Sequence, residues 1–190
     1  MRSRRREVLI AGGALIVLAL VGGFVYFATR TPTNLIQNPS LEDGTASELT
    51  CWALGGFGTN TFTWARTSDA HSGSYAETLD VTEHTSGDRK LVVTQDSGAC
   101  APAASAGQSY GVSAWYKATR APVIFVYYRD RTGAWVYWTQ TGKLPISSTW
   151  TRASYTTPTV PDGATRISIG LGLDGVGSIT MDDFALVVAG

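Results

Sequence analysis

Polar and apolar residues alternate along short stretches of this chain. In the segment 110–117, every second residue is apolar: Tyr110, Val112, Ala114 and Tyr116. The residues between them place Trp115 beside Lys117 on a polar face. In the segment 166–173, Gly170 and Gly172 lie opposite an aliphatic face. Alternation with a period of two is typical of β-strands with one buried face, and glycines on the other face indicate that a ligand, another sheet or a loop approaches the backbone.

Short β-rich runs follow one another from residue 31 onward, separated by turns rich in Gly, Ser and Thr. They are residues 59–67, 74–82, 90–95, 110–118, 123–130, 134–140, 150–157, 165–173 and 178–188. No segment of this region has sustained helical periodicity, and the region contains no internal repeat. Short strands at this spacing predict an all-β fold, a two-sheet β-sandwich.

The segment 123–140 carries aromatic residues on both sides of the turn "RDRTG". Strands joined by this turn form a β-hairpin, so the neighbours Tyr127 and Tyr128 point to opposite faces. Because each sheet of a two-layer protein has one buried face, some of these rings lie outside the core. We assign three residues to the core face: Ile124, Val126 and Tyr128. The open face then holds Tyr127, Arg129, Trp135 and Tyr137; the opposite register would bring Trp138 there.

The first thirty residues differ from the rest. Four arginines, at positions 2, 4, 5 and 6, precede an uncharged apolar run at 8–28. As a helix this run is about 30 Å long, the thickness of the hydrocarbon core of a bilayer. The excess of arginine before it predicts a cytoplasmic tail (1–7), a transmembrane signal anchor (8–28), a linker (29–33) and an exported domain (34–190). The alternative is a cleaved signal peptide, but no small-x-small cleavage site follows the run.

Charge and cysteine content narrow the possible functions. Residues 31–190 contain 10 basic and 14 acidic side chains, so this part lacks the basic surface of a nucleic-acid-binding protein. Its two cysteines, Cys51 and Cys100, are forty-nine residues apart, a separation that matches no metal-binding spacing. Because an exported domain is in an oxidising environment, we predict that they form a disulfide.

Several segments occur in an order that resembles a known family. They are "NLIQNPSLEDG" (34–44), "AHSGSYA" (70–76), "YGVSAWYK" (110–117), "VPDGA" (160–164) and "ITMDDFAL" (179–186). Together they resemble the jelly-roll carbohydrate-binding modules of families four, nine and twenty-two, over residues 34–188. The resemblance implies a two-sheet jelly roll that binds glycan chains along a concave sheet face.

The resemblance also implies a structural calcium ion. Its carboxylate ligands would be Glu42 and Asp182, with Asp183 as the substitute, and backbone carbonyls near Asn38 and in the turn 71–74 would complete the six to eight oxygens that calcium takes. The alternative is that these carboxylates only cap turns. The apolar alternation slips by one residue at Asp182 and Asp183, which predicts a β-bulge there.

The glycan-binding face implied by the resemblance would be built from aromatic and polar side chains: Trp115, Tyr127, Arg129, Trp135 and Tyr137. For any one of these rings, packing in the core is the alternative. For the group this alternative is weaker, because aromatic rings lie on both faces of the hairpin and a sheet in a two-layer protein has only one buried face.

The sequence lacks a recognisable arrangement of catalytic residues. It contains two histidines, His71 and His84, and no H-E-x-x-H motif. Its one G-x-S-x-G string, "GQSYG" (107–111), leads into a predicted strand, whereas a nucleophile elbow connects a strand to a helix. The sequence therefore predicts a protein that is not an enzyme: a carbohydrate-binding module held at the cell membrane by a single pass, with its C-terminal domain outside. Its partners would be a polysaccharide or glycan and the membrane. The alternative is a structural or adhesion-type β-sandwich that binds another surface protein.

Overall fold

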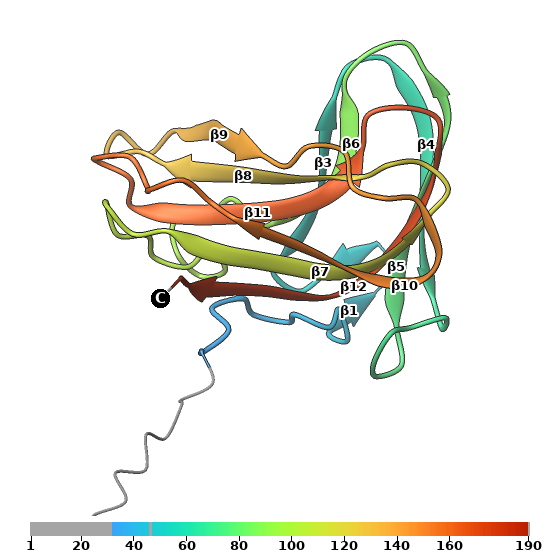
Figure 1. Ribbon diagram of the computed structural model, residues 1–190, viewed down its shortest axis with the longest axis horizontal. Helices are drawn as coiled ribbons and strands as arrows, with labels where there is room; N and C mark the ends of the chain where they lie inside the picture. The colour runs from blue at the N-terminus through green and yellow to red at the C-terminus, as the bar shows by residue number, and fades with distance from the viewer. Residues whose placement is uncertain (1–31, 46, 190) are drawn as a thin grey trace, which may run out of the picture. The chain divides into compact units, whose positions relative to one another are not determined.

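The computed structural model describes residues 32–45 and 47–189, which fold into two five-stranded antiparallel sheets packed face to face (Figure 1). One sheet has the strand order β10-β7-β12-β5-β4, and we call it sheet I; the other has the order β3-β6-β11-β8-β9, and we call it sheet II. The strands are β1 (Gly44–Thr45), β2 (Glu48–Leu49), β3 (Trp52–Phe57), β4 (Asn60–Thr67), β5 (Ala76–His84), β6 (Asp88–Val93), β7 (Tyr110–Ala118), β8 (Val123–Arg129), β9 (Trp135–Gln140), β10 (Ser147–Thr156), β11 (Arg166–Leu173) and β12 (Gly177–Val188). Strands β1 and β2 form a separate small ladder.

The core lies between the two sheets and follows the predicted alternation. Strand β7 of sheet I contributes Tyr110, Val112, Ala114 and Tyr116, each at most 3% exposed. Strand β11 of sheet II contributes Ile167, Ile169, Leu171 and Leu173, each at most 1% exposed. The prediction of an all-β two-sheet sandwich is confirmed, and the described residues contain no helix.

All nine β-rich runs correspond to strands, β4 to β12, but β3 was not predicted. Its sequence "WALGGF" holds Gly55 and Gly56, and glycine is depleted in strands because it offers no side chain to pack. Strand β3 pairs with β6 along its whole length, from Trp52 opposite Val93 to Phe57 opposite Asp88. Tertiary pairing therefore overrides the weak local preference of this segment.

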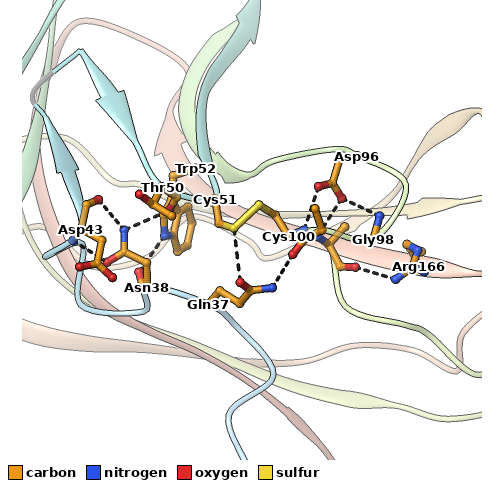
Figure 2. The surroundings of a disulfide bond; sticks show 12 residues. Gln37, Asn38, Asp43, Thr50, Cys51, Trp52, Asp96, Gly98, Cys100 and Arg166 are labelled. Atoms are coloured by element: carbon orange, nitrogen blue, oxygen red, sulfur yellow. Dashed lines mark hydrogen bonds between the residues drawn. A yellow bond between two sulfur atoms is a disulfide. The ribbon is translucent and has the colours of Figure 1, made fainter.

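The predicted disulfide is present. Cys51 and Cys100 are bonded with their Cα atoms 5.0 Å apart, which ties the start of β3 to the loop between β6 and β7 (Figure 2). In that loop the carboxylate of Asp96 accepts the backbone N–H groups of Gly98, Cys100 and Ala101. A cross-link of this loop length stabilises a fold by about 4 kcal/mol in the chain-entropy model.

The predicted transmembrane segment, 8–28, lies outside the described residues, as does the cytoplasmic tail 1–7. Within the part of the chain that the structure describes, no helix has the length and apolar character needed to cross a bilayer.

Candidate functional site

The β8–β9 hairpin has the predicted orientation. Tyr127 pairs with Tyr137 and Arg129 pairs with Trp135, so these four side chains share the outer face of sheet II. Ile124 and Val126 are at most 1% exposed in the core. On the same inner face, the rings of Tyr128 and Trp138 meet edge to face with centroids 6.4 Å apart. The alternative register, with Trp138 on the open face, is thereby excluded.

A hollow of about 530 Å³ lies on the outer face of sheet II. It is lined by Phe57, Asp88, Phe125, Tyr127, Tyr137 and Gln140. Phe57 belongs to β3 and Tyr137 to β9, the two edge strands, and these rings are 66% and 52% exposed. Five strands spaced about 4.8 Å apart would hold the edges of a flat sheet about 19 Å apart. One hollow that touches side chains from both edges therefore indicates a concave sheet with an exposed ring on each wall.

A second hollow of about 170 Å³ adjoins the first, because Phe57 and Tyr127 line both. Its other lining residues are Gly55, Gly56, Lys90, Val92 and Gln95. We call the two hollows together the groove, and distinguish them as the large and the small hollow. The groove combines aromatic rings with carboxylate, ammonium, phenol and amide groups.

An ion pair lies in the floor of the groove. The ammonium of Lys90 contacts Oδ1 of Asp88, and both residues are nearly buried, at 5% and 6% exposure. The same ammonium lies 4.4 Å from the ring centroid of Phe125. Burial lowers the pKa of Lys90, and the hydrogen bond and charge of Asp88 act in the opposite direction. A buried lysine beside a carboxylate is a costly arrangement, and such arrangements are enriched at functional sites.

The outer-face glycines make room for this floor. Gly172 of β11 pairs with Lys90, and a Cβ on Gly172 would lie 2.5 Å from Cβ of Lys90 and 2.1 Å from the carbonyl oxygen of Arg89. Gly170 is similarly close to Val92, at 2.4 Å from its Cγ1. The close approach comes from the adjoining strand β6 of the same sheet, and not from a ligand, another sheet or a loop as the sequence suggested.

Two phenols border the ion pair. Burial raises the pKa of Tyr127 to about 12, and the negative charge of Asp88 and the Tyr137 phenol add to this effect. Burial also raises the pKa of Tyr137, and the Tyr155 phenol and the charge of Asp88 raise it further. Both hydroxyls are therefore protonated at neutral pH, where each can donate one hydrogen bond and accept others.

No protein-family model matches this sequence, and no curated protein matches it. Solved structures do share its architecture. The CBM22-1 xylan-binding domain from Paenibacillus barcinonensis Xyn10C superposes with a TM-score of 0.53 at 16% identity, over 78% of this chain and 90% of that one. A structure of carbohydrate-binding modules from the β-sandwich superfamily superposes with a TM-score of 0.53 at 16% identity, over 82% of this chain and 62% of that one. The chain has the fold of carbohydrate-binding modules.

The same fold occurs inside larger proteins. The enzymatically active domain of tailspike protein 4 from bacteriophage CBA120 superposes with a TM-score of 0.60 at 20% identity. The match covers 82% of this chain but 21% of the tailspike chain, so this chain spans about a fifth of the length of that chain. At these identities the likeness concerns the fold.

The structure places Trp115 apart from the other predicted glycan-binding residues. It lies on β7 in sheet I, whereas Tyr127, Arg129, Trp135 and Tyr137 lie on sheet II, so the expectation of one common face is wrong for Trp115. Its ring stacks on the imidazole of His71, with centroids 4.0 Å apart and an interplanar angle of 14°. Alternation within one strand showed that Trp115 faces away from the core, but it carries no information on which sheet the strand joins.

Two of the four residues on sheet II line the groove, Tyr127 and Tyr137. Arg129 points back to the hairpin turn, where its Nε donates to the carbonyl of Gly133 over 3.1 Å. The other lining side chains of the groove were not predicted. Phe125 could have been found, because it is two residues before Tyr127 on the same strand and therefore on the same face.

The predicted calcium ligands both bind one turn. Asp182 is 0% exposed, and its Oδ2 accepts the backbone N–H groups of His71 and Ser72 over 2.8 and 3.1 Å. Oε1 of Glu42 accepts hydrogen bonds from the backbone N–H groups of Ser74 and Tyr75, over 2.9 and 3.0 Å. In the described residues, no group of three or more His, Cys, Asp or Glu side chains is arranged to hold a metal. These contacts are those of turn-capping carboxylates; calcium binding stays a prediction.

The bulge expected at this site is confirmed. The register between β12 and β7 shifts between Asp182 and Ala185, and Asp183 has a φ of 45°. This conformation turns the Asp183 carboxylate to the same turn, where it lies 2.5 Å from Nδ1 of His71 and accepts the hydroxyl of Ser72 over 2.7 Å. Burial raises the pKa of Asp182 to about 6. Burial also acts to raise that of Asp183, but the hydrogen bonds from His71, Ser40 and Ser72 outweigh it and lower the pKa.

Proposed function

We propose that this protein is a non-catalytic carbohydrate-binding module that binds a polysaccharide chain in the groove of sheet II. The observation that carries the proposal is the pair of exposed rings, Phe57 and Tyr137, on opposite walls of a concave hollow with a polar floor. Sugar rings present C–H groups on their faces and hydroxyls on their edges. Aromatic walls match the faces, and the carboxylate, phenol and amide groups of the floor match the hydroxyls.

The shape of the site favours a sugar over a protein surface. A protein partner of an adhesion domain fits a broad apolar patch with a polar rim. Here the rings line a hollow, and polar groups lie between them. The large hollow, at 530 Å³, falls within the range of about 300 to 1,000 Å³ of ligand sites.

The inventory of the groove supports binding rather than hydrolysis. Most glycosidases use two carboxylates about 5 to 10 Å apart across the scissile bond. Among the described residues that line the groove, only Asp88 carries a carboxylate, and that carboxylate is paired with Lys90.

We place the module outside the cell, held by the apolar segment 8–28. The support is the sequence, in which four arginines precede the apolar run. Protease added to intact cells should then remove the domain, and the mature chain should keep the apolar segment at its N-terminus. Recovery of a soluble product that begins near residue 31 would refute the anchor and leave export in place.

The binding proposal is tested with residues 32–190, which include the exported domain and its described hydrophobic core between Ile36 and Leu186. Retention is measured by affinity electrophoresis in gels that contain β-1,4-galactan, xylan, β-glucan or mannan. We expect at least one polymer to retard the wild type, and Phe57→Ala and Tyr137→Ala to weaken binding by about 1 kcal/mol or more each. Tyr75→Ala removes an exposed ring outside the groove and serves as the control. If no polymer retards the wild type, or if the control weakens binding as much as the two groove variants, the groove is not a glycan site.

A further inference from the structure

The Asp88 carboxylate has one oxygen free to meet a ligand. Its side chain is 9% exposed and lines the large hollow. Oδ1 contacts the ammonium of Lys90, whereas no donor within the described residues contacts Oδ2. A carboxylate oxygen that no protein donor contacts can accept a hydrogen bond from solvent or from a ligand. In the large hollow, that donor can come from a bound molecule.

Lys90 holds this carboxylate in place. Its ammonium is fixed by Asp88 and by three rings, 4.4 Å from the centroid of Phe125 and 5.8 Å from those of Phe57 and Tyr127. Gly172 leaves the space that the stem of Lys90 crosses. Lys90 lines the small hollow and Asp88 the large one. The charged group is therefore negative in the large hollow and positive in the small one. A ligand unit in the large hollow meets the Asp88 carboxylate, and the Lys90 ammonium faces the small hollow.

We propose that Asp88 determines specificity in the groove: the large hollow accepts an uncharged sugar unit and rejects one that carries a carboxylate. Oδ2 accepts a hydroxyl of the uncharged unit. A carboxylate on the sugar at this point offers no proton and brings a second negative charge beside the nearly buried Asp88, where water screens the repulsion of like charges less than it does in bulk solvent. Lys90 is a positioning residue that holds the Asp88 carboxylate in place. The inference rests on the proposed glycan-binding function.

The test compares three forms of one polysaccharide. The first form is the unmodified neutral polymer that retains the exported domain. The second is the same polymer after carboxymethylation, which adds carboxylates. The third is the polymer after hydroxyethylation to the same degree, which adds groups of similar size without charge. We expect the wild type to bind the carboxymethyl form about ten-fold or more weakly than the hydroxyethyl form. Asp88→Asn should bind the neutral polymer more weakly and should bring the ratio of the two modified forms close to one.

A second variant covers the risk that Asp88→Asn leaves Lys90 buried without a partner and unfolds the domain. Asp88→Asn combined with Lys90→Met removes both charges, and thermal melting reports whether it folds. It should also bind the two modified forms equally. A wild type that binds both modified forms equally, or a folded variant that keeps the ten-fold ratio, overturns the role of Asp88. A wild type that no neutral polymer retains overturns the proposed function itself, so the two failures are distinguishable.

Discussion

Glu77 gives the domain a stability that depends on pH, and the Glu77→Gln substitution should remove this dependence. The residue is 1% exposed on β5, and neither carboxylate oxygen receives a hydrogen bond in the part of the chain that the structure describes. Arg66 pairs with Glu77 across the strands but donates its guanidinium N–H groups to the carbonyls of Leu41, Glu42 and Gly44. Burial therefore dominates, opposed by the charge of Arg66, and raises the pKa of Glu77 from 4.5 to about 7.

The sign and size of the effect follow from this shift. Between pH 4.5 and 7 the unfolded chain has lost the Glu77 proton while the folded chain still holds it, so the stability of the fold decreases as the pH rises. A shift of about 2.5 pKa units corresponds to about 3 kcal/mol, fully lost above pH 7. A glutamine resembles the protonated acid in shape and cannot ionise. At pH 5, Glu77→Gln should lie within about 1 kcal/mol of the wild type; at pH 8, it should be more stable by about 3 kcal/mol, or roughly 6 to 12 °C in melting temperature.

The assay is urea denaturation of residues 32–190 at pH 5, 6, 7 and 8, reported as the difference between variant and wild type. This difference cancels the contributions of other groups, including Asp182, whose buried carboxyl titrates in an overlapping range. Glu48→Gln, at an exposed glutamate, serves as the control and should change stability little at any pH. A variant that is less stable than the wild type at pH 8 would contradict the raised pKa of Glu77. A stability difference that does not change with pH would contradict it as well.

Three further predictions concern other parts of the fold. Trp138→Ala should destabilise the domain by about 3 kcal/mol because its ring packs on the core side, while Tyr137→Ala should hardly change the melting temperature; similar losses would contradict the assigned faces. Replacing Cys51 and Cys100 by serine should lower the free energy of unfolding by roughly 3 to 4 kcal/mol in urea titrations, and unchanged stability would contradict the constraint on the unfolded chain. If calcium joins Glu42 and Asp182, chelator should lower the melting temperature, by an amount that corresponds to about 2.7 kcal/mol when calcium was at a hundred times its dissociation constant. An identical melt with and without chelator would leave these two residues as turn-capping carboxylates.

The sequence predicts most of the fold because alternation reports local burial, and it predicts less of the site because the groove depends on pairing. Tyr128 and Tyr127 were assigned to the correct faces, with Tyr127 placed beside Arg129, although the two alternating sets of β8 are equally apolar in sequence. Phe57 was missed, since its strand contains two glycines and becomes a strand through pairing with β6. Trp115 was assigned to the wrong group of rings, since one strand's alternation does not show which sheet the strand joins.

The floor of the groove was harder still to predict. Asp88 and Lys90 lie two residues apart at the charged start of β6, "DRK", and charged side chains are solvated in most proteins. Their burial follows from the rings of Phe57, Phe125 and Tyr127 above the ammonium, supplied by strands that are distant in sequence. The glycines of β11 were the one local signal, and they report the space that Lys90 needs rather than the chemistry it performs.

One extra residue in β9 decides which side chains reach the groove. Strict alternation would place Tyr137 and Gln140 on opposite faces of the strand, because three positions separate them. The pairing of β8 with β9 instead shifts at Trp138, so that Tyr137 lies opposite Tyr127 while Thr139 lies opposite Val126. This β-bulge brings Tyr137 and Gln140 to the same hollow, while the Trp138 ring stays on the core side. A strand without the bulge would give the groove either its exposed ring or its amide, but not both, so the irregularity is a requirement of the site.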